Sequence, residues 1–232
     1  MRIDVLTLFP ELFPGPLGSS VMGRASERGL VQFNAVDIRR FATDERGTVD
    51  DKPYGGGPGM LMMAEPLVSA VESVREPQSL VILTTPRGRV FNQKLARELA
   101  EKEHLVIITG HYEGVDERAI ELAVDMEISL GDFVLTSGIL PAMTIADAVV
   151  RLLPGVLGDD ASSEDESHSN SLLEYPQYTR PPVFRGLEVP EMLLSGDHGR
   201  IAGFRQQQRE RLTRERRPDL WENYMSQTEK EV

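Results

Sequence analysis

Short apolar runs rich in β-branched residues recur along the first part of the chain, separated by polar or glycine-containing segments. Runs of this length and composition are typical of β-strands that are buried in a sheet. The predicted strands cover residues 3–9, 31–38, 80–84, 105–109 and 126–130.

Two segments between or after these runs have helical periodicity. In NQKLARELAEKE, Leu95 and Leu99 share one face with charges on the other, and Asn92 precedes them as a helix cap. A second helix is predicted at residues 144–153, because Pro154 follows it directly. The order strand, helix, strand predicts an α/β fold with a parallel sheet and right-handed crossovers.

The composition changes after this region. The segment GDDASSEDESHSN at residues 158–170 holds acids and serines but no apolar anchor, which is typical of a mobile linker. Helical patterns resume beyond it. We therefore expect an α/β domain, an acidic linker and a small, mostly helical C-terminal domain, at residues 1–157, 158–172 and 173–232.

The C-terminal part concentrates positive charge. The run RQQQRERLTRERR at residues 205–217 holds six arginines against Glu210 and Glu215, a local balance of 6 − 2 = +4. Arginines at three- and four-residue spacing fit a solvated helix face with Glu–Arg pairs, and they fit equally a helix that contacts phosphates. The run alone leaves both interpretations open.

Composition excludes several classes of protein. The 232 residues include no cysteine, and the four histidines lack ligand spacing, so we expect neither disulfides nor a metal site. The sequence shows no signal peptide and no apolar run long enough to span a bilayer. The net charge of −12 argues against indiscriminate nucleic-acid binding. We expect a soluble cytoplasmic protein with no membrane or DNA partner.

The run VDDKPYGGGPGM at residues 49–60 invites comparison with phosphate-binding loops. A Walker loop requires Lys and Ser or Thr after its last glycine, whereas Met60 follows Gly59 here. A dinucleotide fingerprint must follow a strand and open a helix, which this context does not favour. Two interpretations remain: a tight connection, or a rigid surface that lets a flat group approach the backbone.

The last three predicted strands each end in a loop of small or polar residues. In open α/β sheets, ligands bind outside the carboxyl ends of the strands. Three converging loops would offer backbone N–H and C=O groups to a purine and a ribose. These loops are TTPRG at residues 84–88, TGHYEG at 109–114 and LGDFVLTSG at 130–138.

A series of motifs along the chain matches a known family. In order, they are LFPE, VDDKPYGGGPGMLM, GHYEGVDER, GDFVL, LPAM, RLLPGVLG, YPQYTRP and LEVPEMLLSGDHG. In order and spacing, from Phe9 to Leu220, the sequence resembles the bacterial tRNA (guanine-37-N1)-methyltransferases of the SPOUT class. The resemblance implies a parallel α/β sheet with a deep trefoil knot and a homodimer.

The same resemblance implies a cofactor and a substrate. The methyl donor would be S-adenosyl-L-methionine and the partner tRNA, with Mg²⁺ as an optional further cofactor for which the sequence contains no ligand cluster. The glycine-rich run would be a wall beside the target base, and the arginine-rich helix would contact tRNA phosphates. Cofactor contacts carry over to Leu83, Thr84, Thr85, Pro86, Gly110, Tyr112, Glu113, Gly114, Leu130, Gly131, Asp132, Phe133, Val134, Leu135, Leu140 and Pro141.

The implied chemistry requires a base and a positive charge. A carboxylate must remove the proton from guanine N1 before N1 can attack a methyl group. A guanidinium would stabilise the negative charge on O6, and Arg151 matches the family's arginine, although a helix C-terminus also favours a basic residue. At the family's aspartate, this sequence has Glu166, preceded by Asp165. We expect Glu166 to be the base, with Asp165 as the alternative.

Two further departures occur in LTSGILPAM, where the family more often has LSGGELPAM. Ser137 replaces a glycine beside the cofactor, and Ile139 replaces a glutamate. Together with Glu166, they leave room for a non-catalytic module that binds tRNA or protein without methyl transfer. A nucleotide-binding α/β protein is a third hypothesis, against which the missing Walker residues count.

Overall fold

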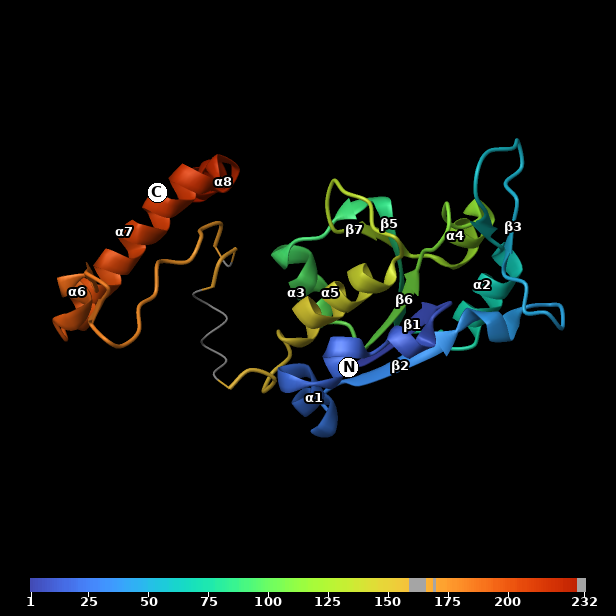
Figure 1. Cartoon of the computed structure of the whole chain (residues 1–232), viewed down its shortest axis with the longest axis horizontal. Coiled ribbons are helices and arrows are strands. Elements are labelled where there is room, and N and C mark those ends of the chain that lie inside the picture. The colour runs from blue at the N-terminus through green and yellow to red at the C-terminus, as the bar shows by residue number, and fades with distance from the viewer. Residues whose placement is uncertain (159–165, 169, 229–232) are drawn as a thin grey trace. The chain divides into compact units, whose positions relative to one another are not determined.

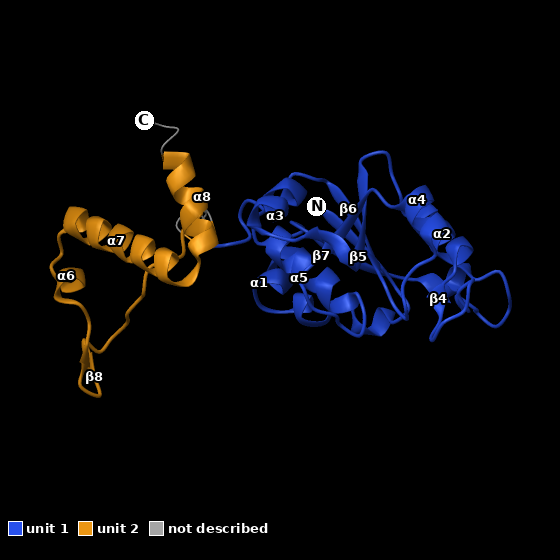
Figure 2. Cartoon of the chain, turned by 90° about the horizontal axis from the view of Figure 1, so that it is seen from above, with its two compact units in different colours: residues 1–158 blue, residues 159–232 orange. Residues whose placement is uncertain are grey.

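The computed structural model describes residues 1–158, 166–168 and 170–228, which fall into two compact units, Met1–Gly158 and Asp159–Val232 (Figures 1 and 2). Asp165 lies outside the described residues. The three-part division predicted from composition stays a prediction. Within the described residues, no helix has the length and apolar character that crossing a membrane requires.

The first unit is built on a parallel sheet of five strands in the order β2-β1-β6-β5-β7. This confirms the predicted α/β class. The strands are β1 (Arg2–Thr7), β2 (Gln32–Asp37), β5 (Ser79–Val90), β6 (His104–Thr109) and β7 (Met126–Ser129).

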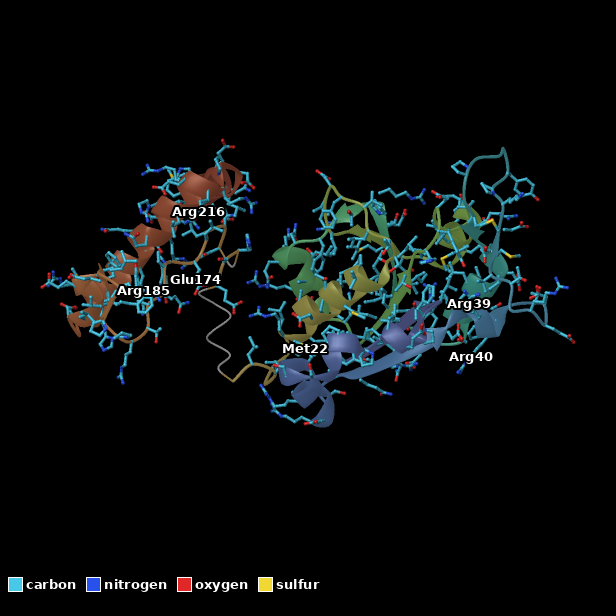
Figure 3. All side chains as sticks on the ribbon, viewed as in Figure 1. Met22, Arg39, Arg40, Glu174, Arg185 and Arg216 are labelled. Atoms are coloured by element: carbon cyan, nitrogen blue, oxygen red, sulfur yellow. The ribbon has the colours of Figure 1, made fainter. Side chains whose placement is uncertain are left out.

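Helices cover both faces of this sheet, as expected where crossovers connect parallel strands (Figure 1). One face packs against α1 (Ser20–Glu27), α3 (Gln93–Ala100) and α5 (Ile139–Val150), and the other against α2 (Ala64–Glu72) and α4 (Glu117–Ala123). Met22 of α1, labelled in Figure 3, belongs to the first of these cores. The smaller elements are η1 (Pro10–Leu12), η2 (Gly15–Gly18), η3 (Ile38–Phe41) and the pair β3 (Asp50–Asp51) and β4 (Leu61–Met62).

The predicted helix after the third strand is confirmed in detail. The Asn92 side chain accepts a hydrogen bond from the Leu95 N–H at 3.0 Å, and Leu95 and Leu99 are buried. The second predicted helix covers residues 144–153, but the observed helix, α5, begins at Ile139 and ends at Val150. Pro141 lies in its first turn, where a missing N–H breaks no helical hydrogen bond.

The third strand is longer than its apolar run. β5 continues beyond Thr84 to Val90, but its pairing with β7 shifts register between Thr84 and Arg89. The segment expected to be a loop is therefore an irregularity within the strand. Its polar residues leave the ladder and then rejoin it.

The amino ends of the strands carry a buried polar network. Asp4 accepts hydrogen bonds from Asn34 at 2.6 Å and from Arg2, and it lies 3.0 Å from His104 Nε2. The other ring nitrogen of His104 is 2.6 Å from the Ser79 hydroxyl. Burial of this carboxylate is tolerated because its oxygens are hydrogen-bonded.

The second unit is mostly helical, as expected. It contains α6 (Glu191–Leu194), α7 (His198–Arg216), α8 (Pro218–Thr228) and the short hairpin of β8 (Val183–Phe184) and β9 (Leu187–Glu188). The arginine-rich run lies on α7. Trp221 of α8 lies 5.5 Å from the Tyr224 ring, and the Arg214 guanidinium is 5.8 Å from the Trp221 ring centre.

Candidate active site

A cavity of about 420 Å³ lies in the first unit, at the carboxyl ends of β6 and β7 and at the irregularity of β5 that follows Thr84. This is the edge of the sheet at which open α/β folds bind ligands. Its volume falls within the usual range for small-molecule sites. The residues that line it come from the three strand-end segments predicted to converge, together with Leu61, Leu83, Val115, Ile120, Ile128, Ser129 and Pro141.

Gly138 holds the three segments together at close range. Its N–H donates to the Gly110 carbonyl at 2.7 Å, and its own carbonyl lies 3.2 Å from the Thr84 hydroxyl. A Cβ at this position would overlap Thr84 Oγ1 and lie 2.6 Å from the Gly110 amide nitrogen. Only glycine therefore allows the backbones of these segments to approach so closely.

The glycine-rich run is anchored to the second of these segments. The Glu113 N–H donates to the Met60 carbonyl at 3.0 Å, and the Met62 N–H donates to the Gly114 carbonyl at 2.9 Å. Gly59 has a φ of +75°, and a Cβ there would lie 2.7 Å from the Glu113 carboxyl carbon. The carboxyl end of the run is thus packed against Glu113, which itself lines the cavity, whereas none of the described residues 49–60 does. A role of the run as a wall beside the target base stays a prediction.

An aromatic cluster forms part of the lining. The His111 ring lies 4.7 Å from the Tyr112 ring and 5.1 Å from the Phe9 ring, measured between centroids. His111 Nδ1 is buried and has no hydrogen-bond partner within the described residues. An imidazole nitrogen in this position can accept or donate a hydrogen bond to a ligand.

One charged residue of the lining, Arg87, is hydrogen-bonded to two carboxylates. Arg87 donates to Glu127 at 2.8 Å and to Glu117 at 2.7 Å. The hydrogen bond to Glu127, followed by that to Glu117, raises the pKa of the Arg87 guanidinium. The side chain therefore stays charged, and its direction is set by both partners.

Comparison with known proteins identifies the family. The model of the family described as tRNA (Guanine-1)-methyltransferase TrmD matches residues 1–223. The chain belongs to this family.

Curated relatives agree with that assignment. A tRNA (guanine-N(1)-)-methyltransferase of Carboxydothermus hydrogenoformans is 57% identical over 220 residues, covering 95% of this chain and 87% of the relative. Proteins of the same name from Dehalococcoides mccartyi and Ruminiclostridium cellulolyticum are 56% and 52% identical, covering 96% and 95% of this chain and 91% and 96% of theirs. Similarity therefore extends across both units.

Most of the cofactor residues expected from the TrmD family come together in the cavity. Those that line it are Leu83, Thr84, Thr85, Pro86, Gly110, Tyr112, Glu113, Gly114, Leu130, Phe133, Val134, Leu135 and Pro141. Gly131, Asp132 and Leu140 do not line it, although each adjoins a residue that does. Contact of any of these residues with a cofactor stays a prediction.

The structure adds lining residues that motif reasoning did not single out. Arg87, His111, Thr136 and Gly138 lie within the three expected segments, beside Ser137, which was expected to lie near the cofactor. The only signal in the sequence was that they lie within the segments predicted to line a ligand site. The partly buried Ile120 and the buried Ile128 also line the cavity. The fold brings them there, and no local pattern in the sequence indicates this.

The expected catalytic residues lie outside this lining. Arg151 caps the C-terminus of α5, where its N–H donates to the Asp147 carbonyl at 3.1 Å. Glu166 belongs to the second unit and is half-buried. Their catalytic roles stay predictions, and the alternative base, Asp165, falls outside the described residues.

Proposed function

We propose that this chain transfers a methyl group from S-adenosyl-L-methionine to N1 of guanine 37 in tRNA. The observation that carries the proposal is the cavity at the carboxyl ends of β6 and β7 and the irregularity of β5, lined by residues of the motifs that relate the chain to the TrmD family. The names of its curated relatives support guanine N1 of tRNA as the target. Position 37 rests on the motif resemblance.

The cavity fits S-adenosyl-L-methionine in size and chemistry. The close approach at Gly138 brings the backbones of the three segments together at the cavity, where backbone N–H and C=O groups can recognise an adenine edge and ribose hydroxyls. Pro86, Phe133 and Pro141 supply apolar surface for a planar ring. When bound, the cofactor supplies an electrophilic methyl group on a sulfonium.

The chain's own task is to make guanine N1 nucleophilic. N1 carries a proton at neutral pH, and we assign its removal to the Glu166 carboxylate. As the proton leaves, negative charge develops on O6, where the Arg151 guanidinium stabilises it. General-base catalysis of this kind contributes about 10²- to 10⁴-fold to a rate.

The remaining parts of the proposal concern the whole protein. We propose a homodimer in the cytoplasm, a trefoil knot at the cofactor site, and the division into a cofactor domain, an acidic linker and a tRNA-binding domain. The arginines of α7 would contact phosphates of the tRNA backbone. The family resemblance leaves Mg²⁺ open, and an assay with and without a chelator decides its role.

The decisive test is methyl transfer from labelled S-adenosyl-L-methionine to tRNA transcripts with G or A at position 37. The wild type is expected to label only the G37 transcript. Glu166→Gln is expected to lower kcat by about 10²- to 10⁴-fold with unchanged cofactor affinity, because it removes the base and keeps the shape. Glu222→Gln, an exposed substitution in α8, is the matched control.

Three other outcomes are informative. Loss of turnover in Asp165→Asn but not in Glu166→Gln would move the base by one residue. Labelling of both transcripts would contradict position 37. Tight binding of tRNA by a wild type that transfers no methyl group would overturn the enzymatic function and leave a binding module.

A further inference from the structure

The second unit contains a cavity of its own, of about 570 Å³. It lies between the extended segment at residues 175–182 and the helices α6 and α7. All of its lining residues belong to the second unit, so it is separate from the cavity at the sheet. The residues that matter here are Tyr175, Tyr178, Arg180, Leu193, Ile201 and Arg205.

The two arginines of this cavity differ from Arg211 and Arg217 of the same unit, which are paired with acidic side chains. Arg211 pairs with Glu215 at 3.0 Å, and Arg217 pairs with Asp219 at 2.6 Å. Among the described residues, neither Arg180 nor Arg205 has a carboxylate within salt-bridge distance. In a chain with a net charge of −12, two guanidinium groups that share a cavity without an acid offer a site for an anion.

Aromatic rings accompany these charges. The Arg205 guanidinium lies 4.7 Å from the centre of the Tyr175 ring, which holds it by a cation–π contact. Tyr178 also lines the cavity, and 50% of its surface is exposed. Leu193 and Ile201 add apolar surface. The cavity therefore combines a planar, stackable face, an apolar surface and two cations.

A nucleotide has the matching features: a flat base that stacks on aromatic rings and a phosphate that arginine recognises. Unpaired nucleotides of RNA are bound in this way, by stacking on tyrosine or arginine and by contacts to the backbone. We propose that this cavity binds one unstacked nucleotide of the tRNA, distinct from the target guanine, with its base against Tyr178 and its phosphate on Arg180 and Arg205. This inference rests on the proposed function, because that function supplies the tRNA.

The test uses the full-length protein and a tRNA transcript with G37, with affinity measured at several salt concentrations. Arg180→Gln and Arg205→Gln are each expected to weaken binding by about tenfold and to reduce the slope of log K against log salt by about 1, since each removes a phosphate contact. Arg185→Gln is the matched control. Arg185, labelled in Figure 3, sits in the hairpin between β8 and β9 and does not line the cavity.

A second pair of variants tests stacking. Tyr178→Leu is expected to weaken tRNA binding by roughly tenfold, whereas Tyr178→Phe keeps the ring and is expected to bind like the wild type. Urea unfolding followed by Trp221 fluorescence, which reports the second unit, is expected to stay unchanged in all variants, which separates loss of the subsite from loss of folding.

The outcomes distinguish this inference from the proposed function. If the arginine variants match Arg185→Gln in affinity and salt slope while the wild type methylates tRNA, the subsite is overturned and the function stands. Free nucleoside monophosphates are a further probe. If they bind the wild type and lose affinity in the variants while tRNA affinity is unchanged, the cavity serves a small nucleotide and the inference is also overturned.

Discussion

At the scale of single residues, Gly138 shows which part of the candidate site the sequence predicts and which part it does not. Its segment was expected to line a ligand site, because glycine and polar residues follow the last strand. Its contacts with Thr84 and Gly110 join positions far apart in the sequence, and no local pattern indicates them. The same holds for His111: its Nδ1, which has no hydrogen-bond partner among the described residues, is placed by packing of the ring against Phe9 and Tyr112.

We therefore expect Gly138→Ala to disturb both stability and cofactor binding. The added methyl group would overlap Thr84 Oγ1 and press on the Gly110 backbone, and overpacking of this kind destabilises by about 1–3 kcal/mol. Urea unfolding measures the free energy of unfolding, and calorimetric titration measures the affinity for S-adenosyl-L-methionine. Both are expected to fall.

Gly203→Ala is the control for this substitution, with the opposite expected sign. Gly203 lies within α7, and a Cβ there meets nothing within 4 Å. Replacing a helix-interior glycine by alanine stabilises by about 0.5–1 kcal/mol. Equal effects of the two substitutions would contradict the close-approach account of Gly138.

At the scale of elements, the hydrophobic pattern predicted all five strands of the large sheet to within a few residues, except for the end of β5. There the register shift after Thr84 interrupts the apolar pattern, although pairing with β7 resumes at Arg89. α5 begins five residues before the predicted start, and it includes Pro141, which the first turn of a helix tolerates. The predicted boundaries are wrong where pairing in the sheet, or position within a helix, outweighs the local conformational preference of the residues.

The corner between α7 and α8 carries a pH-dependent contact. The Arg217 guanidinium donates to both oxygens of Asp219, and this hydrogen bond lowers the pKa of Asp219 from 3.8 to about 2. Because the pKa is lower in the folded state, the contact's contribution to stability is complete above pH 3.8 and is lost as pH falls through about 2.

This contact can be checked directly by carbon NMR. The Asp219 carboxyl resonance is expected to titrate near pH 2 in the wild type and to move back towards 3.8 in Arg217→Gln. Stability at neutral pH is expected to show no pH dependence from this pair. A midpoint that is the same in both proteins would contradict the interpretation.

At the scale of the whole molecule, the two hydrophobic cores that cover the faces of the sheet draw all their residues from the first unit. The lining of the candidate cofactor cavity comes from this unit as well. A sheet covered on both faces by its own helices has the cores that independent folding requires. The change in composition after the first unit allowed the boundary to be proposed from sequence.

A fragment of residues 1–158 is accordingly expected to fold cooperatively and to bind S-adenosyl-L-methionine with nearly the affinity of the full chain. It is expected to transfer no methyl group to tRNA, because it lacks Glu166 and the arginines of α7. Urea unfolding, calorimetric titration and the methyl-transfer assay measure the three properties. A fragment without a cooperative transition would show that the first unit depends on the second.

The chain's single tryptophan gives the second unit an optical signal of its own. Trp221 lies in α8 beside Tyr224 and Arg214, all within the second unit, and the first unit contains none. Tryptophan fluorescence therefore reports the environment of the second unit, whereas far-ultraviolet circular dichroism sums the helices and strands of both units. Recording both signals during one denaturation shows whether the second unit loses its structure together with the rest of the protein, without a label or a truncation.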